Sequence, residues 1–248
     1  MRGAGKCVSK ILSTIAKEVR PGISLLELDQ QAKDLAAQMG VKCAFLGYMG
    51  FPGAVCTSVN DQIVHGIPTG RRLEEGDVVG LDFGVVKDGF YGDSAVTIPV
   101  GKISDDAKKL LKATAQSLYA AIEVSRAGNT LKDIARAIEG VVKPHGYGIV
   151  RDFVGHGIGT KLHEDPQIPN YVAGAQPFTL RAGMTIAIEP MINGGSEFVK
   201  VLDDKWTAVT EDGSLSAHYE HSLVITDGEP EILTEWEGGR FGGLLDSL

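Results

Sequence analysis

The chain has 248 residues, 43% hydrophobic and 23% charged, which is typical of a soluble globular protein with one large domain or two small ones. Its 24 basic and 32 acidic residues give a formal net charge of −8, which argues against general nucleic-acid binding and against docking on an acidic membrane. No apolar run approaches the roughly 18 residues that span a bilayer, and residues 1–12 lack the apolar centre of a signal peptide.

The cysteines agree with a reducing compartment. Cys7, Cys43 and Cys56 are an odd number without Cys-x-x-Cys spacing, so neither a disulfide framework nor a zinc ribbon is expected. Together with the missing signal peptide, they predict a cytoplasmic protein.

Helical spacing of apolar residues, together with capping residues, predicts four helices in two pairs. They are expected at about residues 5–19, 24–38, 104–125 and 130–142. Ser24 with Glu27 is a capping-box pattern. Without gaps, Ser24 aligns with Thr130 and Gly40 aligns with Gly146, which indicates two copies of one helix–turn–helix–strand unit. Any two capped helices look partly alike, but a true repeat predicts a pseudo-symmetric single domain.

Runs rich in β-branched and aromatic residues follow each helix pair and predict strands. They lie at residues 55–59, 78–86, 91–100, 185–192, 198–201, 206–209 and 216–225. Lys87-Asp88-Gly89 and Glu211-Asp212-Gly213 are hairpin-type turns. Consecutive hairpins imply a mainly antiparallel sheet backed by the helices, an α+β layout.

A glycine-rich segment carries two histidines. Residues 153–171 read FVGHGIGTKLHEDPQIPNY, with His156 and His163 among glycines. The glycines and Pro166 argue against a regular helix and place both imidazoles on tight turns or short strands, close to any bound ion or ligand. Taken alone, the segment could simply be a loop that contains histidines.

Acidic residues inside apolar runs favour a site. Asp82 and Asp93 lie in runs that read as paired strands, and Glu189 and Glu220 lie in two later runs. A carboxylate within a buried strand is rare unless it is paired or bound to a metal. With His156 they predict a metal centre.

These five candidate ligands and the glycine-rich segment resemble the type I methionine aminopeptidases of bacteria, which have the pita-bread fold. The resemblance extends from the RGAG start to about Thr234. The ligand order Asp, Asp, His, Glu, Glu is shared with prolidases and aminopeptidase P. The segment around His163 and the HGIP run at His65 resemble methionine aminopeptidases in particular.

The resemblance implies two divalent metal ions, Co, Mn, Fe or Zn, since oxygen-rich ligation with one imidazole suits all four. Asp82 would chelate one ion, and His156 and Glu189 would hold the second. Asp93 and Glu220 would bridge the pair. Two such ions would neutralise four carboxylates that otherwise repel one another.

The implied activity is removal of the initiator methionine from new polypeptides when the second residue is small, by attack of a metal-bridged hydroxide on the first peptide bond. His163 would hydrogen-bond the scissile amide and support the oxyanion. Glu189 would shuttle the proton. His65 would contact the substrate beside the metals; a structural histidine at a turn is the alternative.

A methionine pocket is implied by the same resemblance, with six apolar or aromatic residues at its wall. They are Tyr48, Phe51, Cys56, Trp206, Phe45 and Leu162. Phe45 stands where a small cysteine is frequent, Leu162 where an aromatic is frequent, and one residue is missing before His65. The two exchanges roughly conserve the total side-chain volume of the pocket, and we expect the same reaction. Because the volumes are exchanged between positions, side-chain preference and inhibitor fit should differ.

The implied organisation is one pita-bread catalytic domain at residues 1–234, with pseudo-repeats at about 1–100 and 101–234 and a C-terminal tail at 235–248. The tail is glycine-rich and aperiodic, so it should be surface-bound or frayed. Family members usually begin several residues earlier, so the first helix should start near Met1 without a cap.

Expected partners are N-terminal methionyl peptides and nascent chains, including chains at the ribosome, with no membrane and a monomeric state. Two other functions fit the residues. One is a prolidase-like or aminopeptidase P activity, and the other is a pita-bread binding module without catalysis. Modules of the latter kind lose ligands, whereas all five ligand positions are occupied here.

Overall fold

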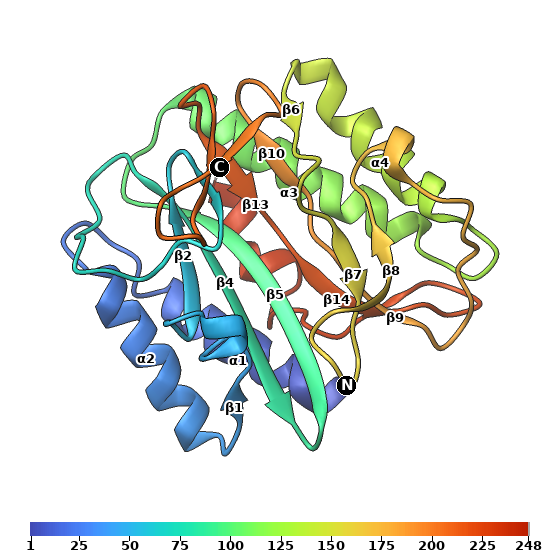
Figure 1. Ribbon diagram of the computed structural model, residues 1–248, viewed down its shortest axis with the longest axis horizontal. Coiled ribbons are helices and arrows are strands. Elements are labelled where there is room, and N and C mark those ends of the chain that lie inside the picture. Colours follow the sequence, from blue (N-terminus) through green and yellow to red (C-terminus); the bar gives the residue numbers. More distant parts are fainter. Residues whose placement is uncertain (248) are drawn as a thin grey trace.

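In the computed structural model, which describes residues 1–247, two pairs of α-helices flank the central strands (Figure 1). The helices are α1 (Arg2–Ala16), α2 (Leu25–Gln38), α3 (Asp105–Val124) and α4 (Leu131–Val142). Short 3-10 helices are η1 (Tyr48–Gly50), η2 (Lys143–His145), η3 (Val172–Gly174) and η4 (Arg240–Ser247). Among residues 1–247, no helix has the length and apolar character needed to cross a membrane.

All strand pairs are antiparallel, and within the described chain the strands form four sheets. The strands are β1 (Lys42–Cys43), β2 (Val55–Val59), β3 (Gln62–Val64), β4 (Val78–Lys87), β5 (Phe90–Pro99), β6 (Gly148–Ile149), β7 (Gly155–Gly157), β8 (Glu164–Ile168), β9 (Thr185–Ile188), β10 (Met191–Asn193), β11 (Val199–Val201), β12 (Ala208–Thr210), β13 (Ser216–His218), β14 (His221–Val224) and β15 (Glu231–Ile232). The sheets have the orders β1-β4-β2 with β5 on β4, β13-β10-β6, β11-β12-β3 and β15-β14-β9-β7-β8. The predicted α+β class and antiparallel pairing are confirmed.

The helix pairs repeat in structure as in sequence. Ser24 and Thr130 each begin the second helix of a pair with a capping box. Each cap residue also forms an isolated antiparallel bridge, Ser24 with Arg72 and Thr130 with Thr179. The predicted helix–helix–strand repeat is confirmed, because the backbone contacts recur at equivalent positions in both halves.

The first helix begins and ends earlier than the predicted residues 5–19. It starts at Arg2 without a side-chain cap, as expected. At its end, the N–H groups of Glu18 and Val19 bond to the carbonyls of Ile15 and Ala16, three residues back. The α-helix therefore ends in a tighter, 3-10-type turn before Pro21.

The core lies between the helices and the long strands of each half. Helix α1 packs on β4 and β5, and α3 packs on β9, β10 and β13. On α1, Val8, Ile11 and Leu12 are fully buried, and each such side chain contributes about 1.5–3 kcal/mol relative to exposure. One apolar cluster extends through both halves. It packs the helices against the strands that carry the acidic residues.

The predicted hairpin at Lys87-Asp88-Gly89 is confirmed. Lys87 pairs with Phe90 across a two-residue loop, and Asp88 and Gly89 have φ values of 52° and 79°. Two positive φ values define the type I′ turn that matches strand twist. The turn sets the register of β4 against β5.

The two long strands predicted in the second half are each broken. Residues 185–192 form β9 and β10, separated at Glu189 and Pro190, and residues 216–225 form β13 and β14, separated at Tyr219 and Glu220. Pro190 has no N–H for the ladder. Glu220 turns its backbone to β5, where its N–H donates to the Ala95 carbonyl at 2.9 Å. The prediction of continuous strands is therefore wrong at both acidic residues.

Two further predictions in the second half of the chain are wrong. Trp206 precedes β12 instead of lying in a strand, because the N–H groups of Trp206 and Thr207 both donate to Asp204 Oδ1 in a turn (2.9 and 2.8 Å). Glu211-Asp212-Gly213 does not close a hairpin, because β12 and β13 belong to different sheets.

The described part of the C-terminal tail is anchored by aromatic side chains. Trp236 and Phe241 are 7% and 1% exposed. The Phe241 ring stacks on the buried His221 ring with centroids 4.4 Å apart. This part of the tail is therefore not frayed, while Leu248 lies outside the described residues. The division into a domain at residues 1–234 and a tail remains a prediction.

Candidate active site

The β4–β5 hairpin presents two carboxylates on one face. Asp82 pairs with Ala95, and Asp93 pairs with Gly84, so Asp82 and Asp93 are diagonal neighbours whose side chains share a side of the sheet. The Asp93 backbone is held from the other half, because Ser222 Oγ donates to the Asp93 carbonyl at 2.7 Å and accepts from its N–H at 3.1 Å. The hairpin and β14 are thus joined beside the carboxylate.

The strand breaks present the two glutamates opposite each other. Ile188 pairs with His221, and the same register continues beyond the break, so Glu189 and Glu220 face one another. The Glu189 carbonyl accepts a hydrogen bond from Asn170 Nδ2 at 3.0 Å. The Glu189 side chain keeps 13% exposure, and Glu220 is 2% exposed.

His156 lies on the short strand β7 with one ring nitrogen left for a ligand. Its Nδ1 is 2.9 Å from the Gly157 carbonyl oxygen. A carbonyl can only accept, so Nδ1 carries the proton, and burial lowers the pKa of His156 to about 4. The neutral ring therefore leaves the Nε2 lone pair unprotonated, 3.4 Å from Glu189 Oε1.

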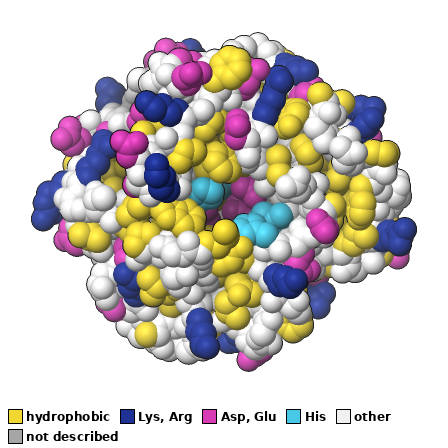
Figure 2. All heavy atoms as spheres, viewed as in Figure 1, with side chains coloured by type: hydrophobic (Ala, Val, Ile, Leu, Met, Phe, Trp, Pro, Cys, Tyr) yellow, Lys and Arg dark blue, Asp and Glu magenta, His cyan; other side chains and the backbone are white. Residues whose placement is uncertain are grey.

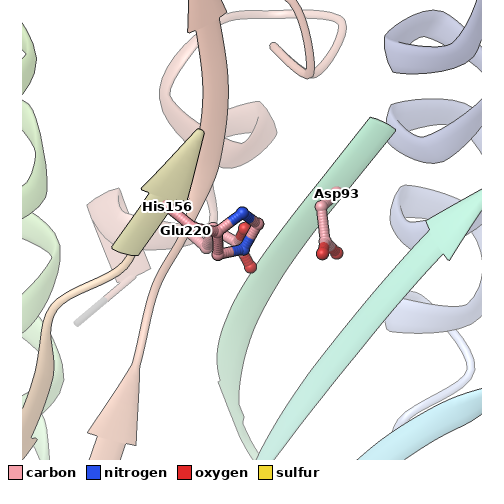
Figure 3. Close-up of side chains that lie close together, drawn as sticks. All are labelled: Asp93, His156 and Glu220. Carbon is pink, nitrogen blue, oxygen red and sulfur yellow. The ribbon is translucent and has the colours of Figure 1, made fainter. Parts of the chain in front are cut away.

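The donor atoms have the arrangement of a metal site. Asp93, His156 and Glu220 each offer a ligand atom, and the three atoms lie within 4.8 Å of one another; their side chains gather between β5, β7 and the segment joining β13 to β14 (Figure 3). Asp82 Oδ1, Asp93 Oδ1 and Glu220 Oε1 are buried and accept no hydrogen bond from described residues. Such oxygens are costly to bury without a cation.

Burial and mutual repulsion disfavour ionisation of these carboxyls. Burial raises the pKa of Asp93 to about 7. Burial raises the pKa values of Asp82, Glu189 and Glu220 well above their usual range, and the Asp93 charge raises them further. Divalent cations would reverse both effects, so the residues present fit metal ions.

One cavity of about 240 Å³ collects all the side chains that the sequence assigned to a site. The space-filling view shows it as a central hollow with acidic side chains at its floor, histidines on its sides and hydrophobic side chains around it (Figure 2). The predicted residues that line it are Phe45, Tyr48, Phe51, Cys56, His65, Asp82, Asp93, His156, Leu162, His163, Glu189, Trp206 and Glu220. Their individual roles remain predictions.

The two accessory histidines lie outside the strands, His65 after β3 and His163 before β8. His65 has a positive φ of 60°, a conformation that a non-glycine residue adopts at a cost and that often occurs at functional sites. Its ring packs edge-on against Phe153 and Trp206, with centroid distances of 5.2 and 6.3 Å. His163 lies on the turn before β8, and its Nδ1 is 2.9 Å from the Tyr48 hydroxyl.

His218 is a site residue that the sequence analysis missed. It is 4% exposed, and its buried Nε2 has no hydrogen-bond partner among the described residues. This atom lies 3.7 Å from Glu189 Oε2, whereas His156 approaches the other oxygen, Oε1. Its position two residues before Glu220 in SAHYEH was the available signal, because alternate strand residues share a face.

Four apolar lining residues were also missed: Met49, Val64, Phe153 and Val154. Phe153 and Val154 begin the glycine-rich segment, so their place beside His156 followed from sequence adjacency. Met49 is 82% exposed at the cavity. No sequence pattern separates an exposed rim residue of this kind from an ordinary loop residue.

Comparison with known proteins places this geometry among metal-dependent peptidases. Residues 1–227 match metallopeptidase family M24. The chain is 47% identical over 234 residues to a methionine aminopeptidase of Clostridium perfringens, covering 94% of each chain. A methionine aminopeptidase structure from Thermotoga maritima superposes with a TM-score of 0.93 at 43% identity, covering 96% of this chain and 95% of that one. A prolidase from Pyrococcus horikoshii shares the fold, with a TM-score of 0.76 at 21% identity, covering 96% of this chain and 61% of that one.

Proposed function

We propose that the 240 Å³ cavity is the active site, because the chain belongs to metallopeptidase family M24 and, within it, to the bacterial type I methionine aminopeptidases. The protein is a metal-dependent hydrolase that removes N-terminal methionine. The observation that carries the assignment of the site is the convergence of an acidic metal-binding floor and an apolar wall in one cavity.

We infer that the site holds two divalent ions. Asp82 would hold one, His156 and Glu189 the other, and Asp93 and Glu220 both. The three buried carboxylate oxygens without partners support this assignment, and so does the charge balance of four carboxylates with two divalent ions. When bound, such ions supply Lewis-acid polarisation of the scissile carbonyl and acidify a water molecule.

The protein's own side chains handle the proton and the oxyanion. Glu189 stands beside His156 with its second oxygen near His218, where it can accept a proton from the attacking water and return it to the leaving amine. His163 can donate a hydrogen bond from Nε2 to the oxygen of the scissile bond as negative charge develops there. His65 is neutral, because burial lowers its pKa to about 4, and can contact the substrate as an uncharged hydrogen-bonding group.

The apolar wall is suited to the methionine side chain. Phe51 packs edge-on against Trp206 with centroids 5.2 Å apart. Phe45 and Leu162 belong to the same buried cluster as Phe51, at 8% and 3% exposure. An unbranched thioether fills irregular apolar space and makes favourable contacts with aromatic edges. Small second residues would be preferred where the peptide leaves this narrow cavity.

The two alternatives have weaker support. The prolidase likeness, at 21% identity, extends to the fold alone, whereas the methionine aminopeptidase likeness is 47% over nearly the whole chain. A binding module without catalysis would not need buried, unpartnered carboxylates that cost free energy without a metal.

The test is peptide cleavage by purified protein. Met-Ala-Ser and Ala-Pro-Ala are incubated with it before and after chelation, and then with Mn, Co, Fe or Zn added back singly. We expect methionine release that is lost on chelation and restored by at least one metal. Cleavage of only the proline peptide would indicate a prolidase, and no cleavage with any metal would support a binding module.

The number of ions is measured separately. Titration of the chelated protein with each metal should give two equivalents per chain, because the ligands divide between two positions. The variant Asp203→Ala changes an exposed carboxylate that does not line the cavity and is the control for nonspecific binding. Saturation at one equivalent with full activity would contradict the dinuclear assignment.

A further inference from the structure

We propose that Tyr48 is a positioning residue for His163: its hydroxyl donates a hydrogen bond to Nδ1 and so holds Nε2–H as the donor toward the substrate. The two atoms are 2.9 Å apart, and the ring centroids are 5.5 Å apart with the planes tilted by 56°. The proposal rests on the function proposed for His163. It gives Tyr48 a role beyond that of an apolar pocket wall.

The backbone holds the Tyr48 hydroxyl in place. The N–H of Tyr48 donates to the Phe45 carbonyl at 2.9 Å, and the N–H of Gly47 donates to the Phe51 carbonyl at 2.9 Å. Gly47 and Met49, the residues on either side of Tyr48, both have positive φ values, 81° and 48°. A tight turn closed in this way limits the directions in which the Tyr48 side chain can point.

Two proton arrangements are compatible with the contact. A neutral imidazole carries its single ring proton on either Nδ1 or Nε2. In one arrangement the phenol donates to Nδ1, and Nε2 carries the ring proton; in the other, Nδ1–H donates to the phenol oxygen, and Nε2 is bare.

The surroundings favour the first arrangement. In the second, the phenol proton must turn away to solvent, because no other described side chain hydrogen-bonds to the Tyr48 hydroxyl. Tyr48 approaches Nδ1 and not Nε2 of His163, so the hydroxyl proton can be shared with Nδ1 while Nε2 stays free for the substrate. The first arrangement is also the one that gives a developing oxyanion a donor.

The two ring nitrogens of His163 therefore have different partners. Nδ1 is used within the protein and Nε2–H is left for the substrate. Without the hydroxyl the ring can rotate, and the second tautomer becomes accessible, so fewer molecules present a donor at a given moment. Turnover should fall, while the apolar contact of the Tyr48 ring with the substrate remains.

The test is Tyr48→Phe, which removes the hydroxyl and keeps the ring. We expect kcat on Met-Ala-Ser to fall about fivefold, the factor for one net hydrogen bond, while KM changes by less than about twofold and metal content stays the same. Phe51→Leu is the matched control, because it alters the aromatic wall without contacting His163; its effect should fall mainly on KM.

A double-variant comparison and a spectrum decide between positioning and packing. If Tyr48 acts through His163, Tyr48→Phe should cause no further loss in a His163→Ala background. In the wild-type protein, ¹⁵N NMR of the His163 ring should show Nε2 protonated and Nδ1 unprotonated, with mixed tautomers in Tyr48→Phe. An unchanged fivefold loss in the His163→Ala background, or a protonated Nδ1 in the wild type, would overturn the proposal. The spectrum needs no turnover, so it remains decisive even if the peptide assay fails.

Discussion

The two halves of the molecule bring carboxylates to one point from different backbone geometries. In the first half, β4 and β5 are uninterrupted, and Asp82 and Asp93 project as diagonal neighbours from one face of a regular ladder. In the second half, the ladder stops on both strands where Glu189 and Glu220 occur. The shorter acidic side chain is therefore used on regular strands, and the longer one at interruptions.

The interruptions also join the halves. At the break, the N–H of Glu220 donates to the Ala95 carbonyl on β5 instead of pairing within its own half. Thr97 Oγ1 on β5 donates to the His218 carbonyl at 2.9 Å and accepts from the His218 N–H at 2.8 Å. The proposed metal centre therefore lies where the two halves meet, and its ligand geometry depends on their correct packing.

The largest expected effect comes from removing a carboxylate of the regular hairpin. Asp93→Ala should abolish methionine release and reduce bound metal, because Asp93 is assigned to both ions and its loss leaves the second-half ligands incomplete. Metal analysis and peptide assay measure both quantities, with Asp203→Ala as the control. A variant that keeps two metals and normal turnover would show that Asp93 is not a ligand of both ions.

His163→Ala should lower turnover while the carboxylates of both halves still bind metal. Turnover should fall by about 10²–10³, the range for loss of one oxyanion donor, with metal content unchanged. The measurement is kcat together with metal per chain. If the variant loses metal, His163 is a ligand and its assignment as a donor is wrong.

His218→Ala tests whether metal binding in the second half depends on the contact of His218 with Glu189. The His218 Nε2 atom lies 3.7 Å from Glu189 Oε2, and loss of an outer-shell partner typically weakens metal affinity by about 10–100-fold. His218→Gln keeps a side-chain donor and should retain most of the affinity. Equal loss in both variants, measured by metal titration, would assign the effect to packing instead of to the donor.

The last expected effect concerns stability instead of activity: it is the pH dependence of unfolding in the metal-free protein. The pKa of Asp93 is raised from 3.8 to about 7, so its contribution to stability is full below the unfolded value and is lost as pH rises through the folded value. The pKa values of buried histidines such as His156 and His218 are lowered from 6.5. They therefore act with opposite sign, but only below pH 6.5.

Above pH 6.5, the carboxyls alone should determine how the free energy of unfolding changes with pH. The metal-free protein should lose up to about 1.4 kcal/mol per pH unit for each carboxyl still protonated, between pH 6.5 and about 8. Thermal unfolding at several pH values measures this loss, and the metal-loaded protein should show a flatter profile. A metal-free protein that becomes more stable over this interval would contradict the raised pKa values.

The sequence alone determined the local features. Ser24 and Thr130 begin helices because their side chains can cap N–H groups that are close in the chain, and Asp88-Gly89 sets the pairing of β4 with β5 because both residues accept positive φ. The shared face of Asp82 and Asp93 follows from that register. The types and order of the candidate ligands were also readable, because they resemble a known family.

Only the tertiary structure decided where the second-half strands stop and which side chains meet around them. The break at Glu220 depends on Ala95, the place of His218 depends on Thr97 and Glu189, and the Tyr48 hydroxyl meets a histidine 115 positions away. A sequence pattern records hydrophobicity and turn propensity between near neighbours. It does not record which distant backbone group offers a better hydrogen-bond partner, and that choice is made only when the two halves pack.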